Sequence, residues 1–496
     1  MFDLVIKNGQ IVDGTGQPSF NGDIAIKDGV IAQLANTQQG ESISGSATET
    51  IDAEGAIVSP GWVDTHSHMD GQATWDPYCS PANHHGITTL VMGNCGIGFA
   101  PCKPNEEAHQ QLIEVVEDVE DIPGAALAEG VKWNWETFPE YLDALDEMPR
   151  AVNVAAQVPH CAIRTYVMGD RGASNERATP EDVEKMSELV AEGIAAGGVG
   201  FTTSRTELHK TRNGISMPGT YSEEDELFGI GAKIGELGKG FYGMVSDWEE
   251  DKWREEMEWM KRLSIENNCR FNFILFYQTS DQWSRVKEQL AFVEQANSEG
   301  AQLVAHVGAR PVNVLMSYHG TVHPFFMHQN FGPLMALSPE ERIAEMRKPE
   351  VRAAILAEPT PSMGIEVADR MVTDFDLMFE LGEEPNYEQG ADESIAAKAK
   401  VAGVSPQEYA YDALLKQDGK AVLYFPFMGY DQRNLDRQFE MLEDKNTVIS
   451  LADTGAHCGV LSDASMPTFL LSHFVRDREG SRFSLEQAIR FHTHDT

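Results

Sequence analysis

The sequence predicts an α/β protein built around a (β/α)8 TIM-like barrel, and two observations carry that prediction. After Pro60, eight apolar strand-like runs alternate with helix-like stretches over most of the remaining 496-residue chain. This alternation favours a parallel barrel over an open sheet. Before Pro60, short alternating runs and turn dipeptides predict a small separate β-module.

The N-terminal β-module is predicted over residues 1–58. Residues 2–14 alternate apolar and polar side chains around Asn8-Gly9, and residues 21–34 repeat the pattern around Asp28-Gly29. Both dipeptides are strong hairpin signals. Residues 49–61 supply a further strand. We therefore expect a small antiparallel module at the start of the chain.

The barrel is predicted over residues 59–496. Its eight strands are expected within residues 61–68, 87–96, 151–160, 198–204, 239–247, 271–278, 302–309 and 446–453. Amphipathic helices are expected between them, for example over residues 180–197 and 280–300, where apolar residues recur three to four apart. Residues of about 101–150 and about 310–420 do not fit the alternation. We predict that they are helical insertions or lids beside the binding face.

Composition excludes several classes of function. The chain has 38 Lys and Arg against 78 Asp and Glu, a net charge of −40. Such an acidic surface opposes binding to nucleic acid or to anionic membranes. The apolar runs are too short for a membrane helix, and the N-terminus lacks the order of a signal peptide. The sequence thus predicts a cytoplasmic protein with free cysteines that acts on a small molecule, with a homo-oligomer left open.

The sharpest chemical signal is the pair His66 and His68, directly after an apolar run. Alternate residues of a strand face the same side, so both imidazoles project together at the end of the first barrel strand. Two imidazoles on one face can bind one divalent metal ion. A bare His-x-His pair is common, however, and two polar histidines at a strand end are the alternative.

Several segments together resemble the amidohydrolase superfamily, and more narrowly its N-acyl-D-amino-acid deacylase (D-aminoacylase) branch. They are PGWVDTHSHMDGQ, HHGITTLVMGNCGIG, VNVAAQVPHCAIR, GVGFTTS, PGTYSEEDEL and LADTGAH, in that order. The resemblance implies a barrel with a small β-sandwich and a hydrolytic site with one or two divalent metal ions, usually zinc. It implies His66 and His68 as ligands, Cys95 as the ligand cysteine typical of the branch, and Asp453 as the aspartate that binds metal and moves the proton.

The chain departs from the family pattern at two strands. The family has histidines at the ends of strands five and six, but residues 242–247 and 273–278 contain none. The family's principal metal-binding mode therefore cannot be carried over. His66 and His68 are the firm ligands, and either Cys95 or Asp453 completes the set.

Six further residues are candidates for contact with the substrate: His160, Arg205, His209, Lys210, His306 and His457. His209, His306 and His457 follow predicted strands and could also compensate for the missing ligands. Arg205 or Lys210 could pair with a substrate carboxylate, because a guanidinium offers a bidentate donor fork. Each of the six could equally be a satisfied core residue or a surface charge.

The predicted function is metal-dependent hydrolysis of an amide C–N bond, in an N-acyl amino acid or a related small amide. Two alternatives stay open: a hydrolase of a cyclic amide or an ester, and a degenerate barrel that only binds its ligand. No P-loop, dinucleotide-binding or nucleophile-elbow motif competes with this interpretation. The last residues of the chain have a helix-like pattern, whereas relatives continue into the closing strands of the β-sandwich. We therefore also expect that the native protein continues past Thr496 and completes the β-sandwich.

Overall fold

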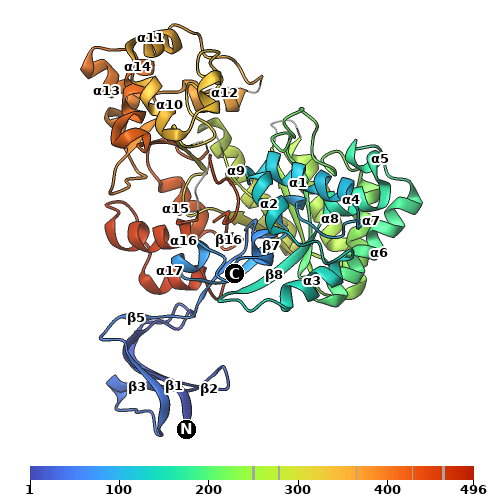
Figure 1. Ribbon diagram of the computed structural model, residues 1–496. Coiled ribbons are helices and arrows are strands. Elements are labelled where there is room, and N and C mark those ends of the chain that lie inside the picture. Colours follow the sequence, from blue (N-terminus) through green and yellow to red (C-terminus); the bar gives the residue numbers. More distant parts are fainter. Residues whose placement is uncertain (249–251, 278–279, 365, 427, 461–463) are drawn as a thin grey trace.

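The computed structural model describes residues 1–248, 252–277, 280–364, 366–426, 428–460 and 464–496. Its centre is a curled sheet of eight parallel strands, arranged in chain order (Figure 1). These strands are β6 (Trp62–Asp64), β7 (Ile87–Met92), β8 (Asn153–Pro159), β9 (Gly200–Arg205), β10 (Phe241–Ser246), β11 (Arg270–Ile274), β12 (Leu303–Val307) and β16 (Thr447–Ile449). Six of them lie within a predicted run, and β9 and β11 each extend one residue beyond theirs, so the barrel prediction is confirmed.

The two edge strands of this sheet, β6 and β16, approach each other beyond their carboxyl ends. The amide of His68 donates to the carbonyl of Thr454 at 2.8 Å, and the amide of Asp453 donates to the carbonyl of His66 at 3.0 Å. These two hydrogen bonds bring the first and last strand ends together at one end of the barrel.

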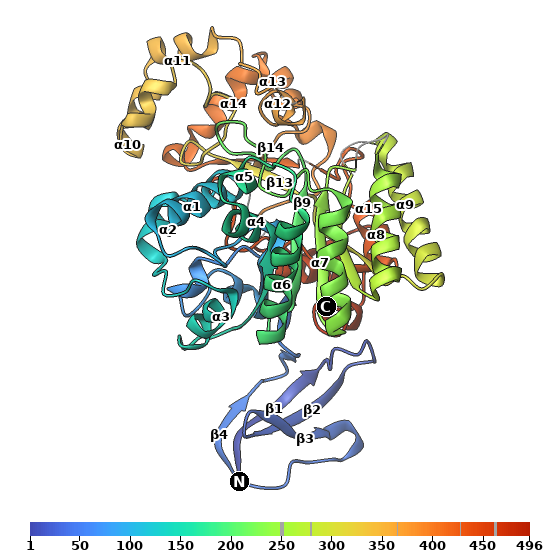
Figure 2. The ribbon, with the colours of Figure 1, turned by 90° about the vertical axis from the view of Figure 1, so that its right-hand side faces the viewer.

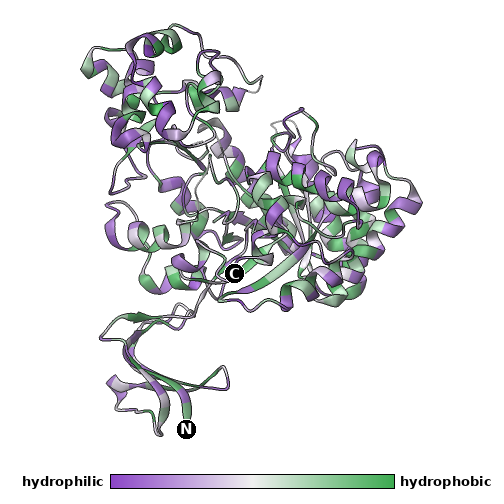
Figure 3. Ribbon diagram, viewed as in Figure 1, coloured by the Kyte–Doolittle hydropathy of each residue, from purple (hydrophilic) through white to green (hydrophobic). Residues whose placement is uncertain are grey.

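Amphipathic helices cover the outside of the barrel strands (Figure 2). They are α4 (His160–Met168), α5 (Asp170–Ala173), α6 (Pro180–Ala196), α7 (Glu224–Leu237), α8 (Trp253–Asn267), α9 (Ser280–Ser298) and α15 (Asp436–Glu443). Helix α6 shows why these segments are helical: Thr179 and Asp182 form a reciprocal capping box, and Pro180 occupies the first turn. The strands are drawn mostly in the hydrophobic colour, as expected for strands covered on both faces (Figure 3).

The N-terminal module is one five-stranded sheet that projects from the barrel (Figures 1 and 2). It contains β1 (Phe2–Ile11), β2 (Phe20–Lys27), β3 (Val30–Asn36), β4 (Ala47–Asp52) and β5 (Ile57–Val58). Asp28 and Gly29 form the predicted turn between β2 and β3, both with positive φ. Two expectations were wrong. Asn8-Gly9 is an irregularity inside β1 rather than a hairpin turn. Strands β4 and β5 pair with β1 in parallel, because the connection over residues 37–46 returns the chain in the direction of β1 and β5 continues that direction after a short turn.

Two helical segments interrupt the barrel pattern. The first holds α1 (Glu106–Glu120), α2 (Gly124–Gly130) and α3 (Phe138–Asp146). The second packs α10 (Pro339–Met346), α11 (Pro349–Leu356), α12 (Glu366–Thr373), α13 (Ile395–Ala402) and α14 (Pro406–Leu414) around an antiparallel sheet of β13 (Asn313–Met316), β14 (Phe379–Leu381) and β15 (Val422–Pro426). It has its own hydrophobic core and stands apart from the barrel helices (Figure 1).

The chain closes with α16 (Met466–Phe469), a π-helical segment (Leu470–Asp477) and α17 (Leu485–Phe491). The ring of His492 stacks on Trp62 at a centroid distance of 5.1 Å, beside the amino end of the first barrel strand. Across the described residues, no helix has both the length and the hydropathy that crossing a bilayer would require.

Candidate metal centre

His66 and His68 lie just beyond the end of β6, and both are buried. Their position is fixed by Asp64, which accepts from the amide of His66 at 3.1 Å and from the hydroxyl of Thr454 at 3.0 Å. The same carboxylate therefore ties the first strand end to the loop after the last strand. The two imidazole rings lie edge to face with centroids 5.3 Å apart.

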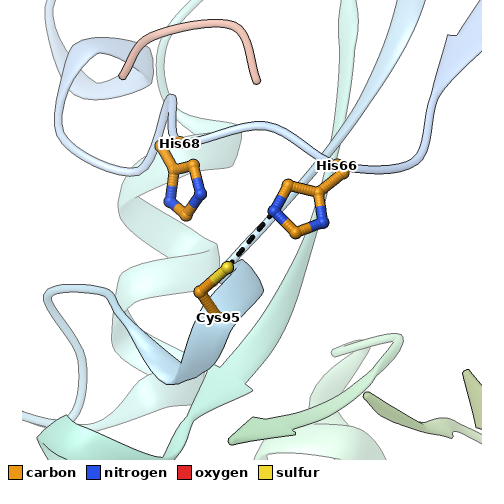
Figure 4. A group of neighbouring side chains, drawn as sticks. All are labelled: His66, His68 and Cys95. Carbon is orange, nitrogen blue, oxygen red and sulfur yellow. Dashed lines mark hydrogen bonds between the residues drawn. The ribbon is translucent and has the colours of Figure 1, made fainter. Parts of the chain in front are cut away.

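Cys95 completes a cluster with the two histidines (Figure 4). Its Sγ lies 3.3 Å from His66 Nε2, and the candidate donor atoms of the three residues all lie within 4.8 Å of one another. Cys95 has a left-handed backbone (φ 55°) in the turn after β7, between Gly93 and Gly96. The side chain of Asn94 donates to the carbonyl of Val91 at 2.9 Å and stabilises this turn.

Asp453 approaches the same cluster from the opposite edge of the sheet. Its Oδ1 lies 3.6 Å from His66 Nε2 and 3.3 Å from His68 Nε2. The backbone of Asp453 is left-handed (φ 54°), as is that of Leu451 (φ 67°). Two such non-glycine residues so close together are strained, which is common where a loop must aim a functional side chain.

These four side chains fit a divalent metal ion. Donor atoms about 2.0–2.3 Å from one tetrahedral ion lie roughly 3.3–3.8 Å apart, and the three separations given above fall within that range. Asp453 Oδ1 is buried, and no described residue gives it a hydrogen bond. The sequence left open whether Cys95 or Asp453 joins the histidines, and the geometry brings both of them to the pair.

The protonation of the cluster is also suited to a cation. Burial lowers the pKa of His66 to about 3, so its ring is neutral and offers a lone pair. Burial raises the pKa of the Cys95 thiol to about 12. A cation bound beside the thiol would favour the thiolate and release its proton.

Glu120 is a site residue that the sequence reasoning missed. It ends α1, is only 2% exposed, and places Oε2 3.5 Å from His68 Nε2. Burial opposes a charge on His68, but Glu120 and Asp453 outweigh burial and raise the pKa of that imidazole. The sequence did contain one signal that could have identified Glu120. Its position continues the helical spacing of the buried residues Ile113 and Val116.

His457 also joins the centre, through contacts with both carboxylates. Its Nε2 lies 3.5 Å from Glu120 Oε2 and 3.5 Å from Asp453 Oδ2. Its amide donates to the carbonyl of Glu120 at 2.5 Å, so the loop after β16 is bonded to the end of α1. His457 was predicted as a substrate contact, and the structure places it at the edge of the metal-ligand cluster.

A cavity of about 480 Å³ opens over these residues. One wall is acidic and includes Glu117, Asp118, Glu120 and Asp121. The other wall is apolar: Val245, Ile274 and Leu451 form a small buried cluster against which Cys95 and Phe276 pack. Val245 and Ile274 belong to the strand-five and strand-six segments, residues 242–247 and 273–278, in which the family pattern expects histidines. Gln278, the last residue of the predicted sixth strand, lies outside the described residues.

The remaining predicted residues are distributed as follows. His209 lines the cavity and shares a hydrogen bond of 3.0 Å with Ser204. His306 lies in the barrel interior, 3.2 Å from Ser450 Oγ, and borders a different cavity at the other end of the barrel. His160, Arg205, Lys210 and His306 are not among the described residues that line the cavity over the metal centre.

Three of those four residues are held by carboxylates. His160 is fully buried and lies 2.7 Å from Glu226. Nε of Arg205 donates to both carboxylate oxygens of Glu256, at 3.0 and 2.9 Å. Lys210 pairs with Glu207 at 2.7 Å. Arg212, which the sequence analysis did not single out, is the one Lys or Arg among the described lining residues.

Comparison with protein-family models matches residues 49–496 to the amidohydrolase family. Two curated relatives come from Alcaligenes xylosoxydans xylosoxydans. D-aminoacylase is 33% identical over 203 residues, covering 41% of this chain and 37% of that protein. N-acyl-D-glutamate deacylase is 32% identical over 232 residues, covering 46% of this chain and 40% of that protein. The aligned parts thus span about two fifths of these relatives.

Solved structures show the same fold. A D-aminoacylase structure aligns over 100% of this chain and 85% of its own, with 21% identity and a TM-score of 0.61. The N-acyl-D-glutamate deacylase of Bordetella bronchiseptica, complexed with zinc and a phosphonate inhibitor, aligns over 99% of this chain and 84% of its own, with 22% identity and a TM-score of 0.61.

Proposed function

Because the chain belongs to the amidohydrolase family, we propose that it is a metal-dependent hydrolase of an amide C–N bond in N-acyl amino acids. The observation that carries the proposal is the cluster of His66, His68 and Cys95. Asp453 approaches both histidines of this cluster from a third strand end. The curated relatives include deacylases of N-acyl-D-aspartate and N-acyl-D-glutamate, which supports this substrate class.

The four side chains would hold a divalent cation. Such a cation polarises the amide carbonyl and lowers the pKa of a nearby water toward about 7. Asp453 accepts the proton of the attacking water and returns it to the nitrogen as the C–N bond breaks. Burial opposes the charge of Asp453, but the neighbouring His68, His457 and His66 outweigh burial and lower the pKa of this carboxyl. The carboxylate is therefore ionised at neutral pH and ready to accept a proton.

The two walls of the cavity favour different ends of the substrate. The acyl group packs against Val245, Ile274 and Phe276, where desolvation of an apolar chain is favourable. The substrate carboxylate faces Arg212, which is exposed and at present pairs with Glu117 and Asp118.

Zinc is the metal we propose, because nitrogen, sulfur and carboxylate donors at tetrahedral spacing suit it. The bound zinc in the Bordetella bronchiseptica enzyme agrees with this choice. A cytoplasmic location and a possible homo-oligomer stay predictions from the sequence.

The proposal is tested with the purified chain and a panel of N-acetyl-D- and N-acetyl-L-amino acids, a cyclic amide and an ester. Release of product is measured before and after removal of metal with a chelator, and again after addition of zinc. We expect hydrolysis of at least one N-acetyl amino acid that is lost on chelation and restored by zinc. Equal activity with no bound metal would contradict the mechanism.

The same panel separates the alternatives. Turnover of only the cyclic amide or the ester would show that the enzyme cleaves that bond instead of the amide of an N-acyl amino acid. The proposed metal dependence would be unaffected. Binding of an N-acyl amino acid without turnover of any compound would favour the degenerate barrel. That alternative is motivated by residues 242–247 and 273–278, which contain no histidine and include the apolar Val245 and Ile274.

A further inference from the structure

A second cavity, of about 760 Å³, opens at the amino end of the barrel. Its lining includes Phe241, Arg270 and Leu303, which are the first residues of β10, β11 and β12. The metal centre lies at the opposite end of the barrel. The interior of such a barrel is usually filled by layers of side chains. This volume instead falls within the range of about 300–1,000 Å³ that is typical of small-molecule sites.

We propose that this cavity binds a fatty-acid anion, with the alkyl chain inside the barrel and the carboxylate at the mouth beside Arg270. The site is separate from the cavity over the metal centre, because the described residues that line the two cavities are all different except for none in common at the mouth. The inference therefore does not depend on the proposed hydrolysis.

Much of the lining is apolar and suits an alkyl chain. Four valines line the cavity from four different strands, β6, β7, β12 and β16: Val63, Val91, Val304 and Val448. Removal of each CH2 group of a ligand from water into such surroundings tightens binding about fourfold. A chain of eight to ten carbons would therefore gain most of its affinity from this part of the cavity.

The polar side chains in the barrel interior are bonded to one another. Ser450 shares hydrogen bonds with Thr65 at 2.9 Å and with His306 at 3.2 Å. Gln157 donates to Asn94 at 3.0 Å. Burial lowers the pKa of His306 to about 4, so this imidazole is neutral at pH 7. The interior therefore offers no charged partner to an ionised head group, which belongs at the mouth.

The mouth carries a positive charge that an anion can use. Arg270 is exposed and is the one Lys or Arg among the described lining residues, and no described carboxylate forms an ion pair with it. A guanidinium presents several donors to a carboxylate. Asn272 lies two residues along β11, on the same face of the strand, and also lines the cavity. Its amide is a second donor for the head group.

The acidic side chain at the mouth opposes this anion only weakly. Asp495 is the one Asp or Glu among the described lining residues. Its carboxylate already pairs with Arg490 at 2.9 Å. Since that ion pair offsets the charge of Asp495, the guanidinium of Arg270 decides the sign of the ligand.

Decanoate, 1-decanol and acetate separate the contributions of chain and charge. Each is titrated calorimetrically into the full-length, metal-loaded chain. We expect decanoate to bind, 1-decanol to bind at least tenfold more weakly, and acetate not to saturate. Octanoate should bind about 15-fold more weakly than decanoate, since it lacks two CH2 groups. Absence of saturable decanoate binding, or equal affinity for decanoate and 1-decanol, would overturn the proposal.

Arg270→Gln tests where the carboxylate binds. It should weaken decanoate at least tenfold and leave the affinity for 1-decanol unchanged. The matched control is Arg262→Gln, at an exposed arginine of the neighbouring α8 that pairs with Glu224 and does not line the cavity. It should change neither affinity. Equal decanoate affinity in Arg270→Gln and Arg262→Gln would overturn the proposal.

Val304→Phe and Phe276→Ala test where the alkyl chain binds. Val304→Phe fills the cavity at the amino end and should weaken both decanoate and 1-decanol. Phe276→Ala removes an apolar side chain from the cavity over the metal centre and should leave both affinities unchanged. The reverse result would place the chain over the metal centre and overturn the proposal. Should Val304→Phe not fold, the two arginine variants still decide the outcome.

Discussion

Oδ1 of Asp453 lies 3.3 Å from Nε2 of His68, so a carboxylate that follows the last barrel strand shares one point with an imidazole that follows the first. The conformation of either segment alone does not determine this separation. The hydrogen bonds between the loops after β6 and β16 set the separation. Metal binding and proton transfer at this centre therefore depend on how the two edge strands of the sheet meet.

Substitution Asp453→Asn is expected to lower kcat by about 10²–10⁴-fold, the usual contribution of a positioned proton-transfer group. The amide keeps the volume of the side chain but cannot accept the proton of water. The measurement is kcat on the best N-acetyl amino acid at saturating zinc. The control is Asp121→Asn, at a residue that lines the same cavity but is not a proposed ligand. Its kcat should fall far less than that of Asp453→Asn. A fall below tenfold in Asp453→Asn would contradict the assigned role.

Substitution Cys95→Ala is expected to weaken binding of the metal ion by about a hundredfold or more, since even changes behind a ligand cost 10–100-fold. Competition with a chromophoric chelator measures the affinity. Cys458→Ala is the control, because that thiol is exposed and is not part of the ligand cluster. Equal metal affinity in Cys95→Ala and Cys458→Ala would show that Cys95 is not a ligand of the metal ion.

Substitution Gly93→Ala is expected to destabilise the turn that carries Cys95. Gly93 has φ +79°, and an added Cβ would lie 2.2 Å from the carbonyl oxygen of Gln157. Gly29→Ala separates the two causes, because Gly29 has φ +75° with nothing within 4 Å. We expect about 1 kcal/mol of lost unfolding free energy for Gly29→Ala, from backbone strain alone, and clearly more for Gly93→Ala. Urea unfolding measures both, and equal losses would contradict the steric argument.

Acid should weaken the fold through Glu226. Burial by itself would raise the pKa of Glu226, but hydrogen bonds and charges from His160 and Arg164 outweigh burial and lower it to about 2, against 4.5 for an ordinary glutamate. The folded state thus binds this proton less tightly than the unfolded state. The stabilisation is complete above pH 4.5 and is lost as the pH falls through 4.5 toward 2.

Urea unfolding at pH 6, 4 and 3 tests this dependence. Glu226→Gln should be less stable than the wild-type chain at pH 6, because Arg164 would stay buried without its carboxylate. The difference between the two proteins should shrink toward pH 3. A difference that stays constant over this range would mean that Glu226 does not titrate in the expected window.

Periodicity and turn chemistry were enough to locate the eight barrel strands and the Asp28-Gly29 turn, because both depend on neighbours a few residues apart. They failed at Asn8-Gly9, where the hairpin signal was overruled by the pairing of β1 with β2, β4 and β5. The pair His66 and His68 was also local. The carboxylate partners of His160 and Arg205 could not be predicted from local pattern. Glu226 and Glu256 belong to helices that follow later strands.

The sequence by itself determined which strands form the barrel and that a metal-competent histidine pair ends the first of them, because both follow from spacing along one segment. Only the tertiary structure decided that Cys95 and Asp453 both approach that pair, and that Glu120 and His457 lie next to the same cluster. It also decided that apolar side chains form the wall of the cavity at strands five and six, in the segments where histidines were expected. Those distances depend on how distant strand ends and the end of α1 pack together, and no short-range pattern encodes that packing.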